Sequence, residues 1–234
     1  MESLTEFLYA IKDYLNPKFI IDTMLEKFGV FVYFGLFFII FAETGLAVGF
    51  FLPGDSLLVV AGLFAYAGKM NLFVLLISLF IAGILGDLVG YLTGRRMGKT
   101  IFSRPKSRIF NPSHLVKAQK FYEKYGGKTI ILARFVPIVR TFAPIVAGAA
   151  EMPYRTFAFY NIFGSFLWIF SMILAGYFLG PLVEGAFGIK LEEHIDKVVI
   201  VVVLLSILPM IFEYLKARRE RKMLATEVIS EKEM

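Results

Sequence analysis

Long apolar stretches separated by charged segments run along most of this chain. Residues 72–94, 157–180 and 198–215 approach or exceed the length of about 20 apolar residues that a helix needs to cross a bilayer. Residues 28–42 are also apolar, but this stretch is short and must tilt or lie in a thinned region of the membrane to cross. The pattern predicts an all-α polytopic membrane protein.

Two further apolar stretches, residues 43–68 and 129–150, contain charges and helix-breaking residues near their centres. The interruptions are Pro53 and Gly54 in the first stretch and Pro137 and Pro144 in the second. Prolines break the helical hydrogen-bond ladder, and backbone left unpaired at membrane depth must be buried in protein or line water. We therefore expect each stretch to form a re-entrant hairpin of two half-helices.

The distribution of charged residues predicts on which side of the membrane each connecting segment lies. Residues 95–128 contain ten lysines and arginines against one acid, and residues 216–234 begin with a basic cluster, so both are predicted to be cytoplasmic. Residues 181–197 lack a basic excess and are predicted to lie outside. Residues 1–27 are predicted to form amphipathic helices with a cytoplasmic N-terminus. A segment that begins at Asn111 predicts an interfacial helix on anionic lipid, with a solvated basic linker as the alternative.

An internal repeat relates the two hairpin regions. A shift of 86 residues aligns Ala61-Gly62 with Ala147-Gly148 and Gly90-Tyr91 with Gly176-Tyr177. The first repeat then covers residues 28–94 and the second residues 129–180. The second hairpin must begin and end in the cytoplasm, and the first must begin and end outside if residues 28–42 cross. Inverted repeats with broken helices are typical of secondary transporters, although chance similarity between Gly- and Phe-rich segments is an alternative.

Composition excludes several kinds of site. The chain is 58% hydrophobic and contains no cysteine, which excludes disulfides, thiolate metal sites and a cysteine nucleophile. His114 and His194 fall in separate predicted loops without partners at metal-ligand spacing. Neither a Ser/His/Asp arrangement nor a Gly-rich nucleotide loop is present. We expect no metal, no cofactor, no catalytic residue and no nucleic-acid partner.

Two arginines give the second hairpin its candidate chemistry. Arg134 and Arg140 lie six residues apart across Pro137, so both flank one turn and can face one ligand. A cation at membrane depth costs about 3 kcal/mol on insertion scales and marks a functional site by default. Guanidinium groups are forked donors suited to phosphate. Arg134 and Arg140 are therefore predicted to bind a phosphate group.

The first hairpin supplies carboxylates at corresponding positions, Glu43 and Asp55. Carboxylates in a low-dielectric site take up protons readily, so this pair is predicted to couple the protein to protons. The alternative is that the four charged residues form buried ion pairs that hold the hairpins together. Asp87 is interpreted as a hydrogen-bonding packing residue, with a further proton site as the alternative, and Asn161 and Trp168 as packing and interface residues. Gly54, Gly62, Gly148 and the prolines are assigned to turns and packing.

These residues resemble the pattern of the DedA family of membrane proteins over about residues 28–180. The matching positions are Glu43, Gly49, Pro53-Gly54-Asp55, Ala61-Gly62, Arg134-Phe135-x-Pro137-x-x-Arg140, Ala147-Gly148, Asn161, Gly164, Trp168 and Gly176-Tyr177-x-x-Gly180. The resemblance implies two opposed re-entrant hairpins, kinship with eukaryotic lipid scramblases, and proton-linked transport of undecaprenyl phosphate in bacteria. It implies that the acidic pair is Glu43 and Asp55, where many members have Glu in place of Asp55, and that the basic pair is Arg134 and Arg140.

The sequence thus predicts a proton-coupled flippase or scramblase of an anionic lipid in the cytoplasmic membrane. Undecaprenyl phosphate is the leading substrate, and another polyprenyl phosphate or a phospholipid is an alternative. A proton or cation antiporter with structural arginines, a general phospholipid scramblase, a membrane phosphatase and a nontransporting scaffold are the other hypotheses. A phosphatase lacks its nucleophile here. The amphipathic helices could mediate a homodimer.

Overall fold

A computed structural model of the protein describes residues 29–46, 54–101, 125–188, 198 and 201, and these residues are helical or lie in turns. The elements are η1 (Gly29–Phe31), α3 (Val32–Gly45), α4 (Gly54–Tyr66), α5 (Leu72–Ile101), α7 (Lys128–Ala133), α8 (Pro137–Ala149) and α9 (Tyr154–Phe187). The all-helical prediction is confirmed for the described residues. Outside them lie Pro53, the predicted helices of residues 1–27, the proposed interfacial helix, and nearly all of the predicted last span and tail.

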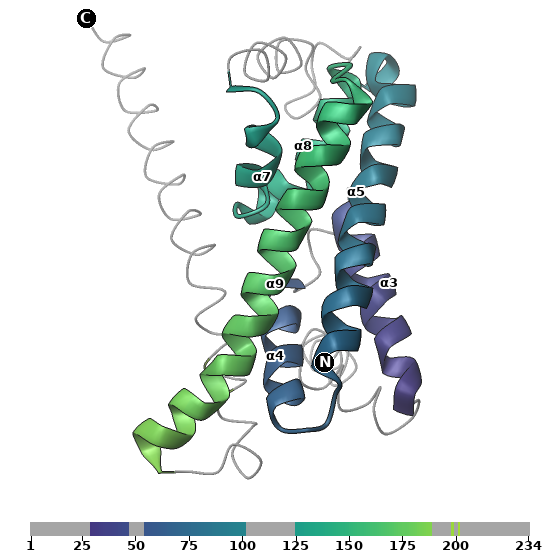
Figure 1. Ribbon diagram of the computed structural model, residues 1–234. Coiled ribbons are helices and arrows are strands. Elements are labelled where there is room, and N and C mark those ends of the chain that lie inside the picture. Colours follow the sequence, from purple (N-terminus) through teal and green to yellow (C-terminus); the bar gives the residue numbers. More distant parts are fainter. Residues whose placement is uncertain (1–28, 47–53, 102–124, 189–197, 199–200, 202–234) are drawn as a thin grey trace, which may run out of the picture.

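Two long helices, α5 and α9, run in opposite directions along the length of the described structure (Figure 1). The segments Leu72–Met97 and Tyr154–Ala186 are long and apolar enough to cross a membrane by length and composition. Helices α3 and α4 lie toward one end of this pair, and α7 lies toward the other. The chain therefore folds as shorter helices packed on two opposed long ones.

The outer faces of the long helices carry large apolar side chains at helical spacing. On α5 these are Phe73, Ile77, Ile81, Leu85 and Val89; on α9 they are Phe159, Phe163, Phe166 and Leu167. All of them are at least one third exposed. Extended exposed apolar surface of this kind is typical of contact with other proteins or with membrane hydrocarbon.

The interrupted stretches form short helices. Helix α3, of 14 residues, covers most of the short apolar stretch 28–42 and extends to Gly45, and α4, of 13 residues, follows the interruption at Pro53. At 1.5 Å per residue α3 is about 21 Å long. In the second stretch α7 ends at Ala133, with Arg134 as its C-cap, and Val136 is extended, with φ −114° and ψ 107°, as expected before a proline. The expected break at Pro144 is wrong, because α8 continues through it. Pro144 only removes the donor that would otherwise bond to the carbonyl of Arg140.

Close helix packing follows the 86-residue repeat. A Cβ atom on Gly176 of α9 would lie 1.9 Å from the carbonyl oxygen of Val59 in α4. The equivalent residues of the other pair, Gly90 of α5 and Ile145 of α8, are also in contact, at 3.6 Å from a Cβ on Gly90 to Cγ1. Each short helix after an interruption thus packs on the long helix of the other repeat.

The two glycines predicted for hairpin packing follow the same rule. A Cβ on Gly62 would lie 2.1 Å from the carbonyl oxygen of Ile173, and one on Gly148 would lie 2.0 Å from that of Tyr91. Neither site has room for a side chain. The absence of a side chain therefore lets α4 approach α9 and α8 approach α5.

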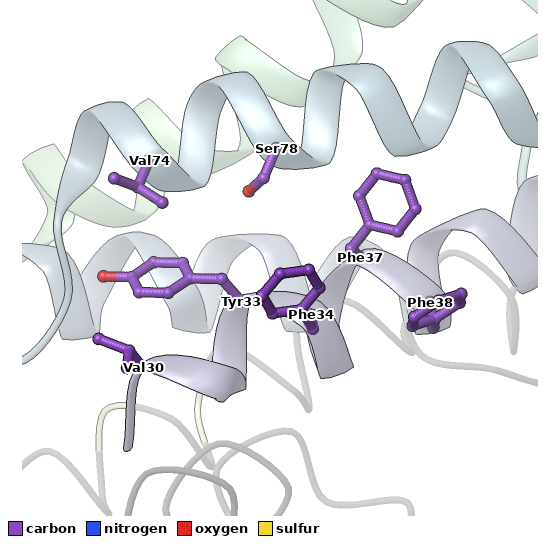
Figure 2. A pocket seen from close by; sticks show the side chains of 7 residues that line it. All are labelled: Val30, Tyr33, Phe34, Phe37, Phe38, Val74 and Ser78. Carbon is purple, nitrogen blue, oxygen red and sulfur yellow. The ribbon is translucent and has the colours of Figure 1, made fainter. Parts of the chain in front are cut away.

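An apolar cavity of about 490 Å³ lies between α3 and α5. Figure 2 shows its lining, which consists of Val30, Tyr33, Phe34, Phe37, Phe38, Val74 and Ser78. The cavity ends where the two helices converge, since a Cβ on Gly45 would lie 2.8 Å from the carbonyl oxygen of Gly86. Convergence at this point brings the C-terminal end of α3 and its Glu43 side chain into the protein interior.

Candidate charged site

Arg140 of α8 joins two carboxylates from two other helices. Its Nη2 donates to Oε1 of Glu43 at 2.5 Å, and its Nη1 donates to Oδ1 of Asp55 at 2.6 Å. The Arg140 and Glu43 side chains are 4% and 1% exposed, whereas that of Asp55 is 28% exposed. The structure therefore brings together three of the four residues predicted to form the site. Asp55 is the most exposed of the three.

Local structure explains how these groups meet. Glu43 lies in the last turn of α3, and Asp55 lies in the first turn of α4. A Cβ on Gly54 would lie 1.5 Å from Oε2 of Glu43, so the glycine makes room for this carboxylate. The N-terminal end of α4 carries the positive end of the helix dipole, which favours the nearby negative charges. Asp55 of the sequence Pro53-Gly54-Asp55 thus supplies one carboxylate, and Gly54 leaves space for the carboxylate of Glu43.

Trp168 of α9 forms the aromatic wall of the site. Its Nε1–H donates to Oδ1 of Asp55 at 2.7 Å, and the Arg140 guanidinium lies over its ring, 4.4 Å from the centroid. The guanidinium of Arg134 lies 5.9 Å from the same ring. Trp168 is fully buried, and cation–π attraction is strongest in such dry surroundings. The tryptophan therefore contacts both arginines and one carboxylate.

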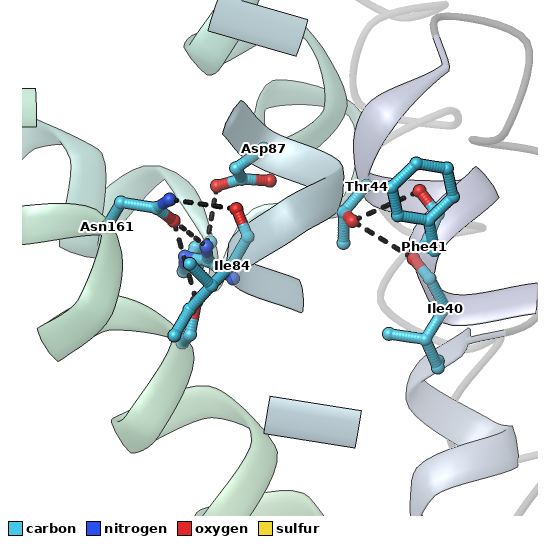
Figure 3. A network of polar contacts seen from close by, with 8 residues as sticks. Ile40, Phe41, Thr44, Ile84, Asp87 and Asn161 are labelled. Carbon is cyan, nitrogen blue, oxygen red and sulfur yellow. Dashed lines mark hydrogen bonds and ion pairs between the residues drawn. The ribbon is translucent and has the colours of Figure 1, made fainter. Parts of the chain in front are cut away.

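Arg134 pairs with a different acid. At the C-terminal end of α7, its Nη2 donates to Oδ2 of Asp87 at 2.6 Å and to Oδ1 of Asn161 at 2.5 Å. The Asn161 amide in turn donates to the carbonyl of Ile84 at 3.1 Å (Figure 3). A Cβ on Gly164 would lie 2.9 Å from Cδ of Arg134, so the long side chain passes where α9 has no side chain.

The four predicted residues therefore fall into two linked groups. Arg140 contacts both predicted acids, whereas Arg134 is bound by Asp87, and the Trp168 ring lies within 6 Å of both guanidinium carbons. Sequence reasoning gave Asp87, Asn161 and Trp168 packing roles and so missed their contacts with the arginines. A signal was present, because Asp87 is the only charged residue of an otherwise apolar span.

Several polar atoms of the site have no hydrogen-bond partner among the described residues. They are Oε2 of Glu43, Oδ1 of Asp87, Nε and Nη1 of Arg134, and Nε of Arg140. Buried polar atoms are nearly always paired, and exceptions point to a bound water, ion or ligand. The described site also holds three carboxylates against two guanidinium groups. If all are ionised, it carries one excess negative charge.

The other expectations for the site concern absences or hairpin turns. Among the described residues, no three His, Cys, Asp or Glu side chains are placed so that they could hold a metal ion together. The expected absence of a metal stays a prediction, and both histidines lie outside the described residues. Pro137 begins α8, and Cβ of Pro144 would lie 3.4 Å from a Cβ on Gly90.

The fold and the site together define an all-helical protein with two long apolar helices and buried charged residues between its helices. Residues 52–178, more than half of the chain, match the VTT domain. The chain belongs to the DedA family, and Protein DedA of Escherichia coli K12 is 44% identical over 217 residues, 92% of this chain and 96% of that protein.

Other relatives extend this family. An uncharacterized membrane protein of Mycobacterium leprae is 40% identical over 73% of this chain and 74% of its own length. Inner membrane protein YqjA of Escherichia coli K12 is 34% identical over 77% of this chain and 80% of that protein. No solved structure matches the chain. The relatives indicate a membrane location.

Proposed function

We propose that the protein moves an anionic lipid across the cytoplasmic membrane in a proton-coupled cycle, with undecaprenyl phosphate as the leading substrate. One observation carries the proposal: Arg140 is almost fully buried and holds two carboxylates that come from two other helices. A buried guanidinium can bind a phosphate when the carboxylates paired with it no longer occupy its N–H donors. The choice of undecaprenyl phosphate rests on resemblance to the family.

Competition between the two carboxylates and a phosphate for Arg140 would couple lipid binding to protonation of the carboxylates. Ionised Glu43 and Asp55 occupy both Nη atoms of Arg140, so a phosphate finds no free pair of Nη donors on that guanidinium. When the carboxylates take up protons they lose most of their attraction for the guanidinium, and a phosphate can replace them. Loss of those protons on the other side then expels the phosphate. Asp55 is the natural entry point, because it is the exposed member of the group.

The same proposal includes the membrane arrangement. We place α3 with α4 in one re-entrant hairpin, in place of the predicted crossing of residues 28–42, and α7 with α8 in the other, entering from opposite faces, with the C-terminus in the cytoplasm. The length of α3, about 21 Å, supports this, since a bilayer core is about 30 Å thick. Opposed hairpins would let the charged site open alternately to the two sides.

Two alternatives make different predictions. A proton or cation antiporter would use the carboxylates alone, with Arg134 and Arg140 as structural partners, and would move ions in vesicles without a carrier lipid. A general phospholipid scramblase would move phospholipids independently of a pH gradient. The unpartnered donors on Arg134 favour a ligand that accepts hydrogen bonds, which a transported cation does not.

Reconstitution into liposomes with labelled undecaprenyl phosphate and an imposed pH gradient tests the proposal. We expect flux that follows the gradient, a strong loss with Arg140→Ala, and loss of pH dependence with Glu43→Gln. The matched controls Arg155→Ala and Glu151→Gln change exposed residues of the same types and should leave the flux unchanged. Flux that survives Arg140→Ala would refute the phosphate role, and flux insensitive to both pH and Glu43→Gln would refute proton coupling.

A further inference from the structure

Asp87 is the third carboxylate of the site. Of the two arginines, Arg134 is the one within hydrogen-bonding distance of Asp87. Its Oδ2 lies 2.6 Å from Nη2 of Arg134, both side chains are 1% exposed, and its Oδ1 has no hydrogen-bond partner among the described residues. We propose that Asp87 neutralises Arg134 and thereby sets how many protons the site must hold before it binds a phosphate. This inference rests on the proposed function for its consequence, but its charge effect can be measured without any lipid.

The surroundings of Asp87 define the charge balance. From the elements packed around it come Arg134 at the end of α7, Arg140 of α8, Glu43 of α3 and Asp55 of α4. Helix α9 contributes the neutral Asn161 and Trp168. Asp87 forms its ion pair with Arg134, whereas Glu43 and Asp55 both pair with Arg140. The excess negative charge therefore lies on the Glu43–Asp55 pair.

The division of partners gives the two arginines different roles. Arg134 is held by Asp87 and by the Asn161 amide, which is itself bonded to the carbonyl of Ile84, so these residues form a connected unit. Arg140 is the guanidinium whose partners exchange. Removal of the charge on Asp87 would leave two carboxylates for two guanidinium groups, and the site would then accept an anion with fewer protons.

The variant Asp87→Asn tests this with little change of shape, because an amide oxygen can still accept from Arg134. Trp168 is the only tryptophan in the chain and contacts Asp55, Arg140 and Arg134. Its fluorescence should therefore report protonation of the neighbouring acids in the purified full-length protein. Loss of a negative charge nearby makes the remaining acids ionise more easily, so the fluorescence midpoint should move down by about one pH unit.

Two further variants separate charge from packing. Asp87→Glu keeps the charge and should keep the midpoint, and Asn161→Asp adds a negative charge beside Arg134 and should move the midpoint up. A purely structural Asp87 would give no such opposite shifts. An unchanged midpoint in Asp87→Asn, or shifts of the same sign in Asp87→Asn and Asn161→Asp, would overturn the inference. If Asp87→Asn does not fold, Asp87→Ser, which also removes the charge, takes its place, and an unchanged midpoint in that variant would overturn the inference.

Binding of farnesyl phosphate, a short prenyl monophosphate, provides the second readout. We expect the unsubstituted protein to bind it more tightly at pH 6 than at pH 8, and Asp87→Asn to bind it about tenfold more tightly than the unsubstituted protein at pH 8. Weaker binding in Asp87→Asn at both pH values would overturn the inference. If farnesyl phosphate binds to no variant while the fluorescence shifts occur, the proposed lipid function fails and the charge role of Asp87 stands.

Discussion

The ion pair between Arg140 and Glu43 makes a quantitative prediction for stability. The donor–acceptor distance is 2.5 Å and both side chains are at most 4% exposed. Two unit charges about 4 Å apart interact by about 4 kcal/mol at an effective dielectric constant of 20. Arg140→Gln leaves the buried Glu43 and the partly exposed Asp55 without their cation and should cost about 3–5 kcal/mol. Glu43→Gln should cost less, because Arg140 keeps Asp55 at 2.6 Å.

The double variant tests whether the two residues act as a pair. Once Arg140 is absent, Glu43→Gln removes an uncompensated negative charge, so the double variant should cost about 2 kcal/mol less than the sum of the single costs. Unfolding in mixed micelles with increasing dodecyl sulfate, followed by circular dichroism, gives the free energies. Arg155→Gln is the control, since this arginine is exposed. Single costs that add within about 0.5 kcal/mol would refute the pairing.

Two other predictions follow from packing and hydrogen bonding. Gly176→Ala should destabilise the protein by about 1–3 kcal/mol, because the new Cβ would lie 1.9 Å from the carbonyl oxygen of Val59. In the same unfolding assay Gly185→Ala, which meets open space, should be neutral or stabilising; equal effects of the two variants would contradict the packing. Trp168→Phe should cost about 1.5–3 kcal/mol through loss of the hydrogen bond to Asp55. Its thermal midpoint by circular dichroism should fall, and an unchanged midpoint would show that this bond is unimportant.

Local patterns predicted the parts of the fold that local chemistry decides. Hydropathy located the cores of α5 and α9, and the residue before Pro137 ends the helical path as the steric clash with proline requires. Pro144 was different, because its neighbours hold α8 together on both sides of one missing hydrogen bond. A proline pattern alone could not distinguish a helix break from a helix interior.

The partner of Arg134 could not be predicted from the sequence. Asp87 lies 47 residues before it, and the pair forms because α5 and α7 both pack on α8 and α9. The internal repeat suggested that Glu43 and Asp55 of the first hairpin would face both arginines. Instead, Asp87 of the long helix α5 pairs with Arg134. The repeat itself carried real tertiary information, since Gly90 and Gly176 make equivalent contacts with the opposite repeats.

The exchange of carboxylates for phosphate at Arg140 can be tested by counting protons during binding. Calorimetry with farnesyl phosphate at one pH, in two buffers with different ionisation enthalpies, gives the number of protons that the protein takes up. Replacement of Glu43 and Asp55 by phosphate predicts uptake of about one proton for each lipid bound, and less uptake in Glu43→Gln. Heats that are the same in both buffers would show that no proton is taken up, and would contradict the exchange.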